Sequence, residues 1–251
     1  MVDPLIDTSP RSTSGHRAPW WLRGAMGWLS RVAPGLAGWS WGEGPAVVLL
    51  HGWNGRGSQV GLLARAVAAA GLTAVAVDGP AHGRSPGRRT NLIDHSAALV
   101  DVARGLPELR GIVGHSFGAL ALSYRWAELP PLPKAVMISP PAEMQIYSRM
   151  FIDAIGASDE VHDRMLALYR KKFDVVWDDI TVENLAPQLA TELLVVHDRT
   201  DRQAPFAHGE RTVRVWPNAR LHPTDRLGHR RILRNDAVAA EIAAFLADGP
   251  A

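Results

Sequence analysis

Residues 111–118, GIVGHSFG, constrain this chain more than any other stretch. They begin with a short apolar run typical of a buried strand, and apolar side chains then continue at helical spacing through Trp126. Glycine two positions before and two after Ser116 removes the Cβ atoms that would collide if the chain turned sharply from strand into helix. The stretch therefore predicts a tight turn with Ser116 at a helix N-terminus. Free N–H groups and the helix dipole favour a developing negative charge there.

Ser116 in this setting has two interpretations. The spacing G-x-S-x-G, preceded by a strand and followed by a helix, is typical of a turn that presents a nucleophilic serine. The alternative is a glycine-rich loop that holds a serine by chance, because short patterns recur by accident. The rest of the chain decides between them.

The chain around this turn alternates between apolar, β-branched runs and helical patterns. Strands are predicted at 46–50, 73–77, 111–113, 135–139 and 193–197, with a weaker one at 220–222 and an edge strand at 39–41. Helices are predicted at 58–70, 92–105, 117–128, 206–216 and 236–247. Apolar strands separated by helices indicate an α/β fold, a mostly parallel central sheet with helices on both faces. Reactive groups in such sheets gather at the carboxyl ends of the strands.

A nucleophilic serine needs a base to take its proton and an acid to orient the base, and both residue types follow Ser116. The predicted strand at 193–197 runs into a loop that holds Asp198 and Asp201, and a later loop places His229 before the last predicted helix. The chain order serine, aspartate, histidine is associated with α/β-hydrolases.

Three aspartates compete for the role of the acid. Asp201 lies within the loop beyond the strand end, which suits a side chain that must reach the histidine loop. Asp198 lies at the first turn of that loop and is expected to bond loop amides instead. Asp225 is the weakest candidate, because no strand end presents it. We therefore predict Asp201 as the acid.

Two further features predict an oxyanion hole and a substrate pocket. The backbone N–H of Trp53, just after the strand at 46–50, is expected to pair with that of Phe117 and hold an oxyanion. Residues 141–190 interrupt the alternation with a helical segment at 143–172, which is expected to form a cap or lid over the active face. Adaptable side chains from the lid, Met144, Tyr147 and Met150, are expected to line the pocket with Trp53 and Phe117 near its base.

Taken together, residues 40–247 resemble a serine hydrolase of the α/β-hydrolase fold superfamily. The segments that carry the resemblance are HGW (51–53), DGPAHGRS (78–85), GHSFG (114–118), HDRTD (197–201) and GH (228–229). The resemblance implies Ser116 as nucleophile, Asp201 as acid, His229 as base and the amides of Trp53 and Phe117 as oxyanion hole. It also implies a lid where residues 141–190 fall.

The sequence departs from the superfamily pattern in two places. Ala81 stands where glycine is common, so the loop at 78–85 is open to a different conformation. The segment before Trp39 leaves little room for the first strands of the full sheet, which predicts a shortened N-terminal edge.

The domain prediction is one α/β-hydrolase domain at 18–251 after a flexible tail at 1–17, since 251 residues suit a single core. The tryptophan-rich segment 18–34 predicts an amphipathic helix. We favour a helix packed on the domain over a lid or membrane-surface helix.

Composition excludes several classes of function. The chain has no cysteine, and its histidines form no H-E-x-x-H pair, so we expect no disulfide, no metal and no cofactor. A net charge of +2 with scattered basic residues argues against a nucleic-acid partner. No apolar run has the length of a membrane span and no secretory signal is evident, so we expect a cytoplasmic protein. The oligomeric state stays open.

These patterns together predict a serine hydrolase that cleaves carboxylic esters of small molecules with an apolar acyl or alcohol part, through an acyl-enzyme on Ser116. Thioesters, lactones and amides remain open as substrates of the same triad. A rival from another class is a non-catalytic binding protein on the same fold, because fold does not fix function. A membrane-associated lipase rests on the 18–34 segment alone.

Overall fold

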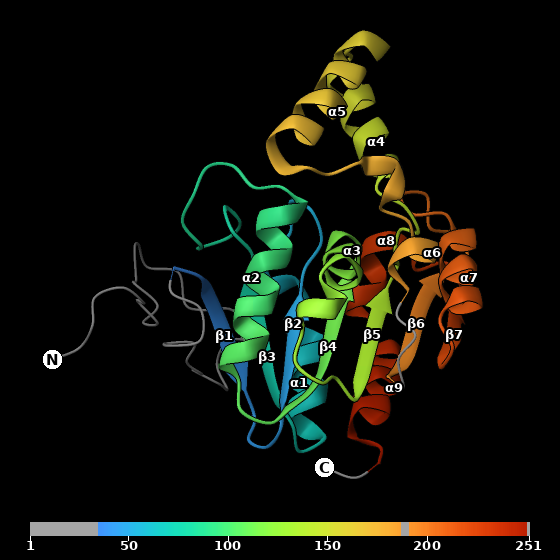
Figure 1. Ribbon diagram of the computed structural model, residues 1–251. Coiled ribbons are helices and arrows are strands. Elements are labelled where there is room, and N and C mark those ends of the chain that lie inside the picture. Colours follow the sequence, from blue (N-terminus) through green and yellow to red (C-terminus); the bar gives the residue numbers. More distant parts are fainter. Residues whose placement is uncertain (1–34, 187–190, 250–251) are drawn as a thin grey trace, which may run out of the picture.

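One sheet organises the fold. The computed structural model describes residues 35–186 and 191–249, and in these ranges the strands follow the order β1-β3-β2-β4-β5-β6-β7 (Figure 1). β1 pairs antiparallel with β3, and every other neighbouring pair is parallel. The strands are β1 (Ala37–Trp41), β2 (Ala46–Leu50), β3 (Thr73–Asp78), β4 (Leu109–His115), β5 (Lys134–Ile138), β6 (Glu192–Asp198) and β7 (Ala219–Thr224). The predicted α/β fold is confirmed.

The apolar runs lie where the sequence predicts strands. β2 coincides with the predicted residues 46–50, and each of the other predicted strands overlaps an observed one. The weaker run at 220–222 lies inside β7, and Trp39-Ser40-Trp41 lies inside β1 at the edge of the sheet. Fully apolar strands fold this way because helices cover both faces of the sheet.

Alternate side chains of each strand enter two hydrophobic cores. Val48 and Leu50 of β2 belong to the core beneath α2 and α3, whereas Val47 and Leu49 belong to the core beneath α1 and α9. The helices of the first core are α2 (Leu92–Gly105) and α3 (Phe117–Tyr124), with Trp216 after α7 (Phe206–Val215). Those of the second are α1 (Gly61–Ala69) and α9 (Asp236–Ala247), which pack against each other.

The chain between β5 and β6 leaves the sheet at its carboxyl edge and forms helices above it (Figure 1). The predicted helical segment 143–172 is a pair of helices, because Gly156 adopts a left-handed conformation with φ 64° and ends the first of them. Their bounds are α4 (Gln145–Ile155) and α5 (Asp159–Phe173), followed by the short α6 (Val182–Leu185). The position of this pair is the one expected for a lid.

Some predictions fall on residues outside the described ranges. These are the tail at 1–17, the tryptophan-rich helix at 18–34 and the last part of the predicted insertion, residues 187–190. Within 35–186 and 191–249, every helix is too short or too polar to cross a membrane.

The loop after β3 contains the alanine that departs from the superfamily pattern. Ala81 adopts the left-handed conformation, with φ 59°, that ordinarily favours glycine. The buried carboxylate of Asp78 holds the loop, because its two oxygens accept hydrogen bonds from the amides of Gly57 at 2.6 Å and Arg84 at 2.7 Å. The loop therefore takes a tight turn in spite of the alanine.

Candidate active site

Ser116 lies on a strained turn between β4 and α3. Its backbone has φ 54° and ψ −116°, which is costly for a residue with a side chain. A Cβ at Gly114 would lie 2.6 Å from the Gly118 oxygen, and a Cβ at Gly118 would lie 2.6 Å from the Leu50 oxygen. Both glycines are therefore required by space, as the sequence pattern predicts.

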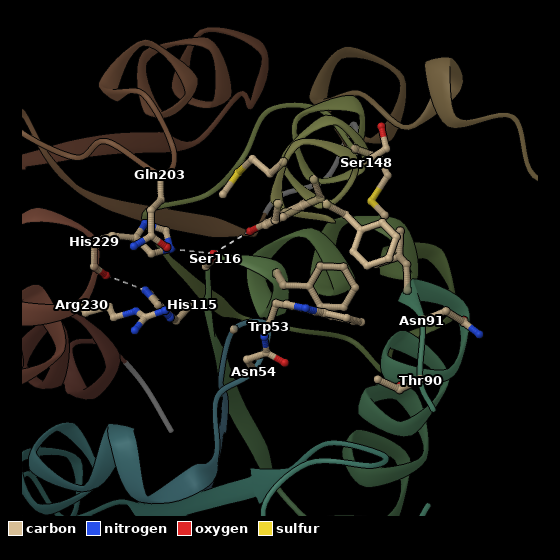
Figure 2. Close-up of a pocket in the computed structure, with 18 of the residues that line it drawn as sticks. Trp53, Asn54, Thr90, Asn91, His115, Ser116, Ser148, Gln203, His229 and Arg230 are labelled. Carbon is tan, nitrogen blue, oxygen red and sulfur yellow. Dashed lines mark hydrogen bonds between the residues drawn. The ribbon is translucent and has the colours of Figure 1, made fainter. Parts of the chain in front are cut away.

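Three predicted site residues from separate segments meet at the carboxyl edge of the sheet: Ser116 between β4 and α3, Asp201 after β6, and His229, which lies in the short helix α8 (Gly228–Arg231) and not in a loop as predicted. Ser116 Oγ lies 2.8 Å from His229 Nε2, and His229 Nδ1 lies 2.7 Å from Asp201 Oδ2. Figure 2 shows Ser116 and His229 facing each other, with a dashed line between them. All three residues are buried, so these hydrogen bonds are shielded from water.

The charge on Asp201 fixes which nitrogen of His229 carries the proton. Burial by itself would raise the pKa of Asp201, but hydrogen bonds from His229 and from the amides of Ala204 and Gln203 hold that pKa below the usual aspartate value. An ionised carboxylate only accepts hydrogen bonds, so His229 Nδ1 donates to it. Nε2 is then free to accept the hydroxyl proton of Ser116, as a general base must.

The other two candidate acids lie elsewhere. Asp198 is buried and accepts bonds from the Thr200 amide and hydroxyl through Oδ1, and from Thr224 Oγ1 and the Leu227 amide through Oδ2. This is the loop-bonding role expected from the sequence. The exposed Asp225 lies 3.3 Å from the guanidinium of its neighbour Arg226.

The two amides predicted for an oxyanion hole lie beside Ser116. A Cβ at Gly52 would come within 3.0 Å of the Ser116 Cβ, so the loop that carries Trp53 approaches the serine closely. Among the residues that the structure describes, the N–H groups of Trp53 and Phe117 have no hydrogen-bond acceptor. Amides without acceptors next to a nucleophile are suited to an oxyanion.

The sequence matches the model of the Alpha/beta hydrolase family over residues 47–241. The chain belongs to this family. Comparison with functionally curated proteins found no match.

Many solved structures of the α/β-hydrolase fold resemble the chain. An esterase from Exiguobacterium antarcticum is 14% identical, with a TM-score of 0.64 over 84% of this chain and 95% of that one. A serine hydrolase from Cycloclasticus zankles is 18% identical, with a TM-score of 0.61 over 84% and 94% of the two chains. A bromoperoxidase from Bacillus anthracis is 16% identical, with a TM-score of 0.65 over 85% and 95%. At these identities the likeness shows the fold alone.

In this α/β-hydrolase, a cavity of about 700 Å³ opens beside Ser116. All five residues predicted to contact substrate line it: Trp53, Phe117, Met144, Tyr147 and Met150. Phe117 makes edge-to-face contacts with two other aromatic rings of the lining. Its ring centroid lies 5.1 Å from that of Trp53 and 5.4 Å from that of Tyr147. The side of the cavity formed by α4 is mostly apolar, and Ser148 is the one polar residue labelled in Figure 2 that belongs to this helix.

Sequence reasoning missed two contacts in the site. His115, to which the sequence patterns assign no role, donates from Nε2 to the backbone oxygen of His229 at 2.9 Å and so helps to hold His229 in place. The hydroxyl of Tyr147, expected only to line the pocket, lies 2.6 Å from Ser116 Oγ. Helical spacing places Tyr147 on the cavity side of α4, but no sequence signal gives the reach of its hydroxyl.

No group of acidic and histidine side chains in the described ranges is arranged to hold a metal ion. The histidines beside the site are instead buried as neutral bases. Burial lowers the pKa of His51 to about 4 and those of His95 and His115 to about 3.

These neutral histidines predict that the protein loses stability in mild acid. In the unfolded chain a histidine takes up a proton below about pH 6.5, whereas the folded ones stay neutral until about pH 4 or 3. The unfolded state therefore binds more protons, and the free energy of unfolding falls with pH, by up to about 1.4 kcal/mol per pH unit for each histidine once the pH is below the unfolded value. Urea unfolding between pH 7 and 5 measures this slope. His95→Leu should reduce it by one histidine's share, and an unchanged slope would contradict the assignment.

Proposed function

We propose that this protein is a serine hydrolase that cleaves carboxylic esters of small molecules. The observation that carries the proposal is the continuous hydrogen-bonded chain from Asp201 through His229 to Ser116, with distances of 2.7 and 2.8 Å. A serine, a neutral imidazole and an ionised carboxylate in this order form the arrangement that activates a hydroxyl for attack on a carbonyl.

The reaction follows from the positions of these groups. Ser116 Oγ attacks the ester carbonyl while its proton passes to His229 Nε2, and the amides of Trp53 and Phe117 hold the resulting oxyanion. His229 then gives the proton to the departing alcohol, which leaves an acyl group on Ser116. Water, deprotonated by His229, attacks this acyl-enzyme and releases the acid and the free serine.

The cavity favours substrates with an apolar acyl or alcohol part. Met144, Met150 and Trp53 contribute flexible or flat apolar surface to its lining. A thioester, a lactone or a small amide would use the same triad, so the choice among these substrates rests on assay. A cytoplasmic location remains part of the proposal.

A fluorophosphonate probe tests this function directly. We expect the probe to label Ser116, as identified by mass spectrometry of the modified peptide, because an activated serine attacks phosphorus as it attacks a carbonyl. Failure of the folded protein to react would instead favour a non-catalytic binding protein. Rates on p-nitrophenyl esters of increasing acyl length, and on the matching thioester and amide, then define the substrate class.

A further inference from the structure

A tyrosine of the lid touches the atom proposed as the nucleophile. Tyr147 is on the first turn of α4, and its hydroxyl lies 2.6 Å from Ser116 Oγ. Its ring packs edge to face on Phe117, the residue after the serine, with an interplanar angle of 89°. The phenol is therefore placed both by its helix and by the ring of Phe117.

The hydrogen-bond inventory of Ser116 decides the direction of this contact. The hydroxyl has one proton, which goes to His229 Nε2, and two lone pairs. Tyr147 must therefore be the donor, and Oγ keeps a second lone pair for attack on a carbonyl. Burial raises the pKa of the Tyr147 hydroxyl well above its usual value, so the phenol keeps the proton that it donates to Ser116 Oγ.

We propose that Tyr147 is a catalytic hydrogen-bond donor to Ser116 Oγ that acts chiefly in the hydrolysis of the acyl-enzyme. This role rests on the proposed function. It assigns the lid a part in the chemistry in addition to lining the pocket.

The expected benefit follows from the charge on Oγ at each stage. In the acyl-enzyme, Oγ is an ester oxygen whose electron density is shared with the carbonyl, so it is a poor acceptor. When the tetrahedral intermediate collapses, the bond between the acyl carbon and Oγ breaks, and Oγ takes the electron pair and then the proton from His229 Nε2. The bond from Tyr147 is stronger to this charged oxygen than to the ester oxygen, and only such a difference accelerates a step.

Acylation gains less from the same contact. The free enzyme already has the Tyr147 hydrogen bond to the neutral hydroxyl, so both the starting state and the transition state are stabilised. The tyrosine should therefore affect the two half-reactions unequally. This inequality distinguishes a donor in catalysis from a residue that only supports the lid.

The test is Tyr147→Phe, which keeps the ring and removes the hydroxyl. Pre-steady-state assays on p-nitrophenyl esters separate the burst of acylation from the slower release of the acyl group. We expect the deacylation rate constant to fall about tenfold or more, with a larger burst, while acylation changes less. Tyr124→Phe is the matched control, because Tyr124 lies on α3 and does not line the cavity. It should leave both rate constants unchanged.

Fluorophosphonate labelling separates failure of this role from failure of the proposed function. An unaltered protein that does not label would overturn both. If the unaltered protein labels and turns over, an equal deacylation rate in Tyr147→Phe would overturn the role of Tyr147 alone. Faster labelling and faster turnover of the variant would also overturn it, because the tyrosine would then be restraining the serine.

A second replacement covers loss of folding in the phenylalanine variant. Incorporation of 3-fluorotyrosine at position 147 keeps the ring and hydroxyl and makes the phenol a stronger donor. We expect deacylation at least as fast as in the unaltered protein. Deacylation about tenfold slower than in the unaltered protein would overturn the proposal.

Discussion

Ser116→Ala should lower kcat for ester hydrolysis by on the order of 10³- to 10⁶-fold, because among the described hydroxyls of the cavity lining Ser116 is the one hydrogen-bonded to His229. Steady-state kinetics on a p-nitrophenyl ester measures the loss. The substitution removes the hydroxyl from a turn whose shape is imposed by Gly114 and Gly118, so the fold should be retained. Circular dichroism and the melting temperature provide that control.

His229→Ala should cost a similar factor, and the double variant should cost little more than either one. Serine and base act as a unit, so once one of them is replaced, replacing the other causes almost no further loss of kcat. Multiplicative losses in the double variant would indicate that the two residues act separately. Ester turnover by a folded Ser116→Ala protein near the original rate would remove Ser116 from the mechanism.

Much of the fold follows from local patterns in the sequence. Apolar β-branched runs predict the inner parallel strands well because these strands are buried on both faces and carry no polar alternation, whereas the edge strand β7 is only partly buried and gives a weaker pattern. The turn at Ser116 is predicted equally well, because only glycine fits at positions 114 and 118. A Cβ at Gly114 would collide with the backbone oxygen of Gly118, and a Cβ at Gly118 would collide with that of Leu50. Asp201 and His229 follow from chain order, because parallel strands bring their carboxyl ends to one edge.

The missed contacts depend on distances that no local pattern encodes. His115 and His229 are 114 positions apart, and their hydrogen bond joins the end of β4 to the short helix α8. Tyr147 and Ser116 are 31 positions apart, and their contact depends on the packing of α4 over the carboxyl edge of the sheet, where the Tyr147 ring lies edge to face on Phe117. Periodicity assigns a face to a helical residue, but the reach of one hydroxyl across a cavity depends on the tertiary arrangement.

Asp201→Asn should reduce kcat by up to ~10⁴-fold with little loss of stability. Asp201 Oδ1 accepts the amides of Gln203 and Ala204, at 2.8 and 3.0 Å, and Oδ2 faces His229 Nδ1. In the variant, the amide oxygen of the side chain must face those two N–H donors, which turns its NH₂ group toward Nδ1. Nδ1 then becomes an acceptor and the proton moves to Nε2. A base protonated at Nε2 cannot take the proton of Ser116.

Asp198→Asn is the matched control, because it makes the same chemical change three residues earlier, at the end of β6. Asp198 accepts hydrogen bonds on both oxygens, from Thr200 on Oδ1 and from Thr224 and Leu227 on Oδ2. An NH₂ group in place of either oxygen would therefore face hydrogen-bond donors. We expect a loss of about 1–3 kcal/mol in the free energy of unfolding, with kcat changed far less than by Asp201→Asn. Urea unfolding and steady-state kinetics on both variants give the comparison. If Asp198→Asn instead abolished turnover while Asp201→Asn remained active, the acid would be Asp198, and the bond between Asp201 and His229 would serve the fold rather than the reaction.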